Sequence, residues 1–169
     1  KNGLHFVDNI ELLTDFENKK RNLSLTYAVR DGIISHCGEI DEECLKPRDE
    51  YIDLNDYKEP NQYSPYTWEA CVVKIADNIS YLGRDLEDAK EMKLITDRDI
   101  NSIDKTIENI RLNNSSIIGY LTGDLCKNSS PEEGLKFSKE AYETMEKIKK
   151  FNYEKIYKIK KSLVDSGYL

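Results

Sequence analysis

Apolar residues recur at helical spacing along most of the chain, and the longest such segment dominates the pattern. It begins after Thr67, a candidate N-cap, and runs to about Met92. One face of this predicted helix should enter a core and carries Val72, Ile75, Ala76, Ile79, Leu82 and Leu86. The opposite face carries three acids and a phenol at intervals of four, four and three residues, namely Asp77, Tyr81, Asp85 and Asp88.

The same periodicity predicts helices on both sides of this segment. Residues 5–17 form the first candidate, and a final helical segment follows Phe151. The intervening helices each have a polar residue that can cap them, namely Ser24, Thr96, Asn114 and Ser138. Asp99 completes an approximate capping box with Thr96. With no repeat and no strand pair recognisable, the predicted fold class is all-α.

The predicted helices are interrupted once, by a long polar segment over residues 38–66. Pro47, Pro60 and Pro65 punctuate it, and no periodicity survives. Loops of this length in compact domains are commonly functional lids or disordered segments, so it is a candidate border of a site. The whole chain of 169 residues is predicted to form a single helical domain over residues 1–169, with this loop inside it.

Composition and charge narrow the function classes. The formal net charge of -7 and the pI of about 5.0 argue against a general nucleic-acid binder but leave a local basic patch, and so nucleic-acid contact, open. No apolar run is long enough to span a membrane, and the start has no signal-peptide pattern, so we expect a cytoplasmic protein. The four cysteines lack paired spacing and are expected to be free thiols. A zinc site at His36, Cys37 and Cys44 would lack a fourth ligand.

Periodicity alone favours a solvated acidic face for the stripe that contains Asp77. The string from Val72 to Tyr81, followed by Asp85, is more specific. It closely resembles the last signature helix of the HD-domain deoxynucleoside triphosphate triphosphohydrolases, the dGTPase-like family. Three further stretches resemble other motifs of that family, namely residues 3–5, 25–36 and 151–157. The resemblance implies an HD-domain-like helical bundle.

The resemblance also implies roles for particular residues. Asp77 would be the final ligand of a divalent metal such as Mg²⁺ or Mn²⁺, and His5 would lie near the scissile phosphate as a catalytic residue. Tyr81 would pack against the deoxyribose, and Asp85 would accept a hydrogen bond from the 3'-hydroxyl. The implied reaction is metal-dependent hydrolysis of a deoxynucleoside triphosphate to deoxynucleoside and triphosphate.

The chain lacks the upstream His and His-Asp motifs of HD enzymes, since its only histidines are His5 and His36 and neither precedes an Asp. We therefore expect it to be the C-terminal part of a longer enzyme, with the other metal ligands outside this chain. Two alternatives stay open: another HD-type nucleotide phosphohydrolase, and a non-catalytic helical module for regulation or interaction. The resemblance further implies a homo-oligomer but fixes neither the subunit count nor the base preference.

Overall fold

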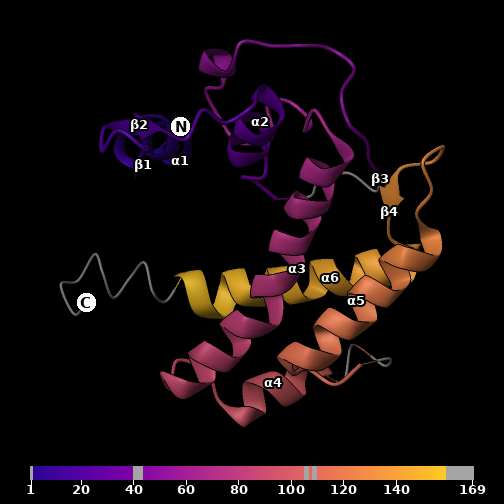
Figure 1. Cartoon of the computed structure of the whole chain (residues 1–169). Coiled ribbons are helices and arrows are strands. Elements are labelled where there is room, and N and C mark those ends of the chain that lie inside the picture. Colours follow the sequence, from indigo (N-terminus) through magenta and orange to yellow (C-terminus); the bar gives the residue numbers. More distant parts are fainter. Residues whose placement is uncertain (1, 40–43, 105–106, 108–109, 159–169) are drawn as a thin grey trace. The chain divides into compact units, whose positions relative to one another are not determined.

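The computed structural model describes residues 2–39, 44–104, 107 and 110–158. They fall into two compact units, Lys1–Ala76 and Asp77–Leu169. Helix α3, Trp68–Glu91, gives its first turns to one unit and its remaining turns to the other (Figure 1). The described residues are mostly helical, which confirms the predicted fold class at that level.

The first unit contains helices, short strands and loops. Its helical elements are α1 Asn2–His5, the π-helix η1 Phe6–Ile10, α2 Tyr27–Ser35 and the 3-10 helix η2 Leu54–Asp56. Its strands are β1 Leu12–Thr14, β2 Lys20–Asn22 and β3 Cys44–Leu45. The core of this unit includes the buried side chains of Leu4, Ile34, Leu54 and Tyr57.

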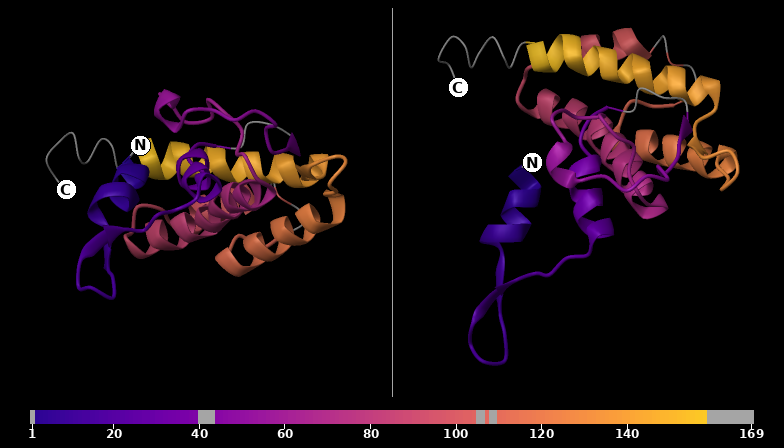
Figure 2. Two further views of the ribbon diagram at one scale, coloured as in Figure 1. Left: turned by 45° about the horizontal axis from the view of Figure 1, so that its top comes forward. Right: turned by 90° about the horizontal axis from the view of Figure 1, so that it is seen from above.

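The expectation of a helix over residues 5–17 holds only as far as Ile10, where η1 ends, and the expectation of no strand pair is wrong. Strands β1 and β2 pair antiparallel and project away from α2 (Figure 2). The Asp15 carboxylate accepts hydrogen bonds from the backbone N–H groups of Glu17 and Lys19, both at 2.9 Å, and Asn18 has a φ of 60°. These local bonds favour a tight turn over a helix. Phe16 is consequently 95% exposed at the turn.

Helix α2 begins two residues later than the predicted cap implies. The hydroxyl of Thr26 accepts the N–H of Val29 at 3.4 Å, whereas Ser24 lies in the left-handed region with a φ of 49°. Helix α3 begins where predicted, because the Thr67 hydroxyl accepts the N–H of Ala70 at 3.2 Å.

The second unit contains α4 Asp97–Asp104, α5 Asn114–Asn128, β4 Leu135–Lys136, α6 Lys139–Asn152 and the π-helix η3 Tyr153–Tyr157. Thr96 and Asp99 form the predicted capping box, and Ser138 caps α6 as predicted. The cap of α5 is Asn113, one residue before the predicted Asn114. Ile107 and Ile110 continue the helical spacing of Ile100 and Ile103 in the sequence but lie outside α4.

Close packing in the second unit fixes the last turns of α3. A Cβ atom on Gly83 would lie 2.6 Å from the Cα atom of Asn114, so only glycine permits this approach of α3 to α5. Helix α6 contacts both α4 and α5. The buried apolar side chains of this unit include Ile79, Leu82, Leu86, Ile117, Leu121, Met145 and Ile148. Across the described part of the chain, no helix has the length and apolar character needed to span a membrane.

Candidate functional site

The candidate site lies on helix α3, which carries Asp77, Tyr81 and Asp85 at successive intervals of four residues. The predicted anchoring of this helix holds for Ile75, Ile79, Leu82 and Leu86, which are all buried. It fails for Val72, which is 50% exposed, and for Ala76, which is exposed. These two residues lie one turn apart on a line that continues through the exposed Ser80 and Arg84, outside the arc that enters the core.

Asp77 presents its carboxylate to solvent at the start of the stripe. Within the described residues, this side chain has no hydrogen-bond or ion-pair partner, although its backbone carbonyl accepts the Ser80 hydroxyl at 2.8 Å. A free, exposed carboxylate can serve as one ligand of a hard divalent cation. Over the same residues, however, no group of three or more His, Cys, Asp or Glu side chains could hold a metal ion.

Tyr81 lies one turn further along and is half-buried. Its hydroxyl donates to Oδ1 of Asn78 at 3.2 Å, and Asn78 is itself only 2% exposed. The bond to a buried partner fixes the orientation of the phenol ring. An oriented ring beside a carboxylate is suited to packing against a hydroxyl-bearing group such as a sugar.

Asp85 is held by a residue to which the sequence assigned no role. The hydroxyl of Tyr157, in η3, donates a hydrogen bond to Oδ2 of Asp85. The Nδ2 atom of Asn152 donates to the carbonyl oxygen of Leu82 at 3.0 Å, which attaches the start of η3 to α3. Tyr157 belongs to the stretch 151–157 that resembles a family motif, and this was the only sequence signal for it.

Asp88, the last acid of the stripe, forms an ion pair with Arg84 at 3.0 Å. The two side chains are 46% and 64% exposed, and such surface pairs contribute little to stability. Both charges are therefore already paired at the surface, and Asp88 is assigned no site function.

The two histidines lie in the first unit. His5 ends α1, is exposed, and has its Nδ1 atom 3.2 Å from the amide nitrogen of Asn9. His36 is the C-cap residue of α2. Within the described residues the four cysteines form no disulfide, as predicted, and the sulfur of Cys37 lies 3.7 Å from Nε2 of His36.

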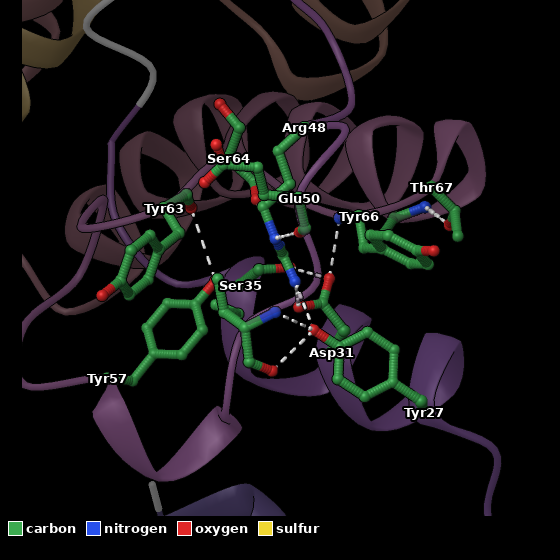
Figure 3. Close-up of polar contacts among 12 residues, drawn as sticks. Tyr27, Asp31, Ser35, Arg48, Glu50, Tyr57, Tyr63, Ser64, Tyr66 and Thr67 are labelled. Carbon is green, nitrogen blue, oxygen red and sulfur yellow. Dashed lines mark hydrogen bonds and ion pairs between the residues drawn. The ribbon is translucent and has the colours of Figure 1, made fainter.

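A second polar cluster joins α2 to the segment that was predicted as a loop (Figure 3). The fully buried carboxylate of Asp31 pairs with Arg48 at 2.5 Å and accepts the backbone N–H of Tyr66 at 2.7 Å. Arg48 also donates to the hydroxyl of Tyr27 at 2.7 Å and to the carbonyl oxygen of Ser64 at 2.5 Å. This network holds the described part of residues 38–66 against α2.

The electrostatics of this cluster indicate a structural role. Burial opposes the charge on Arg48, but the hydrogen bond and charge of Asp31 outweigh it and raise the pKa of the guanidinium. Burial raises the pKa of the nearby Tyr57 to about 12. The Arg48 guanidinium therefore stays charged and the Tyr57 phenol stays neutral at physiological pH. Neither of these two groups has the intermediate pKa that acid–base catalysis at neutral pH favours.

Comparison with known proteins bears on the α3 site. No family profile matches the chain, and no solved structure is similar to it. The chain is 26% identical to a deoxyguanosinetriphosphate triphosphohydrolase-like protein of Caldanaerobacter subterraneus subsp. tengcongensis, over 90% of this chain and 38% of that protein. A protein with the same name from Clostridium tetani is 25% identical over 91% of this chain and 40% of its own length. Another, from Rickettsia bellii, is 36% identical over 54% of this chain and 24% of its own length.

These matches confirm the resemblance to dGTP triphosphohydrolase-like proteins that the residues around Asp77 suggested. The chain spans about two fifths of the length of the relatives that match most of it.

Proposed function

We propose that this chain is part of a metal-dependent hydrolase that converts deoxynucleoside triphosphates, dGTP among them, into deoxynucleoside and triphosphate. The observation that carries the proposal is the arrangement of Asp77, Tyr81 and Asp85 on consecutive turns of α3, in a chain similar to proteins named triphosphohydrolase-like. One helix face then offers a free carboxylate, an oriented phenol and a second carboxylate.

Asp77 fits the role of one metal ligand, because its carboxylate is exposed and without a described partner. One carboxylate does not make a metal site, so the remaining ligands come from outside this chain. A bound divalent ion would polarise the phosphate and lower the pKa of water.

Tyr81 and Asp85 would select the sugar. The ring of Tyr81 would occupy the space of a 2'-hydroxyl and exclude ribonucleotides. In Asp85, Oδ2 accepts the Tyr157 hydroxyl, which leaves Oδ1 to accept a 3'-hydroxyl. His5 would donate to the phosphate, as the resemblance to the family implies.

The test uses the full-length protein with dGTP and Mg²⁺ or Mn²⁺, and separates the products by anion-exchange chromatography. We expect intact triphosphate and deoxyguanosine from the wild type, and a loss of at least about a thousandfold in turnover for Asp77→Asn. Asp88→Asn is the matched control. It also removes a carboxylate charge from α3, but one that already pairs with Arg84 on the surface.

Other products would favour one of the alternatives. Orthophosphate in place of triphosphate would indicate another class of nucleotide phosphohydrolase. Unchanged turnover by Asp77→Asn would overturn the assignment of Asp77, and no turnover by the wild type under any metal would favour a non-catalytic module.

A further inference from the structure

A buried lysine that the proposed chemistry does not use lies one turn before Asp77. Lys74 is 5% exposed, and its ammonium group is surrounded by oxygen atoms of the first unit. The carbonyl oxygens of Ser35, His36, Cys37 and Gly38 lie at 3.3, 3.4, 2.9 and 3.3 Å from Nζ, and Oδ1 of Asn61 lies at 2.8 Å. We call these five oxygen atoms the carbonyl cage.

The cage is built from the end of a helix. Its four carbonyls follow one another where α2 ends, and the last carbonyls of a helix lack intrahelical donors. They also carry the negative end of the helix dipole, which favours a cation. An ammonium has three N–H donors, so five acceptors exceed what it needs and suit a spherical cation equally well.

Special backbone geometry closes the cage. Gly38 has a φ of 101°, and a Cβ atom at that position would collide with the Asn61 side chain. Asn61 is also left-handed, with a φ of 62°, and its Nδ2 atom donates to the carbonyl oxygen of Glu39 at 2.8 Å. Two residues in the left-handed region thus bring an amide oxygen onto a helix end.

We propose that the carbonyl cage is a monovalent-cation site whose resident cation is the Lys74 ammonium. Rings of carbonyl oxygens replace the hydration shell of potassium ions in the same way. The cage attaches the first turns of α3 to the end of α2, so Lys74 acts as a positioning residue for the turn that carries Asp77. This last step rests on the proposed function, whereas the cation site does not.

Removal of the lysine tests the cation site. Lys74→Ala should lower the melting temperature of the 169-residue chain. Ammonium or potassium chloride should raise it again by about 3 °C or more, relative to lithium chloride at equal ionic strength. Lys74→Met is the matched control, because its side chain fills the space of the lysine stem and blocks the cage. Equal responses of Lys74→Ala and wild type to the three salts would overturn the cation site, as would a Lys74→Met variant as stable as wild type.

A second measurement needs no lysine variant. In the folded wild-type chain, nitrogen-resolved NMR should detect one lysine ammonium protected from exchange with water, and Asn61→Ala should shorten that protection at least tenfold. A wild-type spectrum without a protected ammonium would overturn the proposal even if the lysine variants failed to fold.

Turnover of the full-length protein separates the positioning role from the proposed function. Lys74→Ala should lower kcat more than it changes KM, and ammonium should restore kcat together with the melting temperature. Restored stability with an unaltered kcat would overturn the positioning role. A wild type without hydrolytic activity would instead overturn the proposed function and leave the cation site standing.

Discussion

Tyr157 donates a hydrogen bond to the carboxylate of Asp85 from a position 72 residues further along the chain. The contact joins the π-helix η3 to α3 and gives the acidic stripe an aromatic neighbour. Isolated π-helical turns inside or at the end of α-helices are frequent at functional sites, because the changed register redirects a side chain. The contact therefore marks Asp85 as a residue with an organised environment.

Removal of the Tyr157 hydroxyl should weaken the second unit modestly. Tyr157→Phe keeps the ring and deletes one hydrogen bond to a charged acceptor, which should cost about 1–2 kcal/mol in the free energy of unfolding. Urea denaturation of the chain measures this. Tyr153→Phe is the control within the same π-helix, since Tyr153 is exposed and its ring faces the ammonium of Lys158 at 5.3 Å. Equal losses in the free energy of unfolding for Tyr157→Phe and Tyr153→Phe would contradict a stabilising contact between Tyr157 and Asp85.

Asp85 should determine whether the substrate must carry a 3'-hydroxyl. We expect the kcat/KM of the wild-type full-length protein to be about tenfold or more higher for a 2'-deoxynucleotide than for a 2',3'-dideoxynucleotide. Each factor of ten corresponds to about 1.4 kcal/mol of transition-state stabilisation. Asp85→Asn should lose most of that preference, because it weakens the acceptor without changing the shape of the side chain.

Asp88→Asn again serves as the control for Asp85, because it alters the neighbouring carboxylate that pairs with Arg84. A preference that persists in Asp85→Asn, or that disappears in Asp88→Asn, would contradict the assignment of the sugar contact.

Local sequence signals predicted many helix starts but not the contacts across the chain. The caps at Thr67, Thr96 and Ser138 were predictable because a polar side chain bonds to an N–H a few residues away. The Asp85–Tyr157 bond was not, since it depends on how α3 and η3 pack.

Sequence reasoning also failed where two local tendencies competed. Val7, Ile10, Leu13 and Phe16 have helical spacing, yet the side-chain bonds of Asp15 stabilise a turn and produce the β1–β2 hairpin. On α3, helical spacing alone could not tell that Val72 lies beyond the edge of the buried arc, because that edge is set by the neighbouring elements.

The buried ion pair between Asp31 and Arg48 should be sensitive to the loss of one partner. Arg48→Met leaves the fully buried Asp31 carboxylate without its counter-ion and should cost about 3–5 kcal/mol of stability. Arg30→Met is the control, because Arg30 pairs with Asp8 at 2.6 Å where both side chains are partly exposed, and should cost about 1 kcal/mol or less. Chemical denaturation measures both, and similar losses would contradict the structural role of the Arg48 network.

Cys71 should make the chain less stable in alkaline solution. Burial raises the pKa of this thiol from 9.0 to about 12, so the folded state keeps the proton that the unfolded state releases near pH 9. The contribution of the buried, protonated thiol to the free energy of unfolding is fully present below pH 9 and is lost as the pH rises towards 12. Melting temperatures should therefore fall less between pH 8.5 and 10.5 in Cys71→Ala than in wild type, after normalisation at neutral pH.

Thiol labelling checks the same assignment without a stability measurement. Cys37 and Cys126 are exposed and should react rapidly with a thiol reagent at pH 8, whereas Cys71 should react only as the chain unfolds. Rapid modification of Cys71 in the folded chain would contradict its burial.

The 169-residue chain without any further segment should bind dGTP weakly. Its formal net charge is -7, and the α3 face that would meet the nucleotide carries the carboxylates of Asp77 and Asp85, which repel a triphosphate. Asp77 supplies a single metal ligand there, so a bound metal ion cannot be expected to offset this repulsion.

Isothermal titration with dGTP and Mg²⁺ should give a Kd above about 1 mM, corresponding to less than about 4 kcal/mol of binding free energy. The full-length protein should bind much more tightly in the same buffer. Micromolar binding by the 169 residues would show that they hold a complete nucleotide site and would contradict the need for ligands from elsewhere.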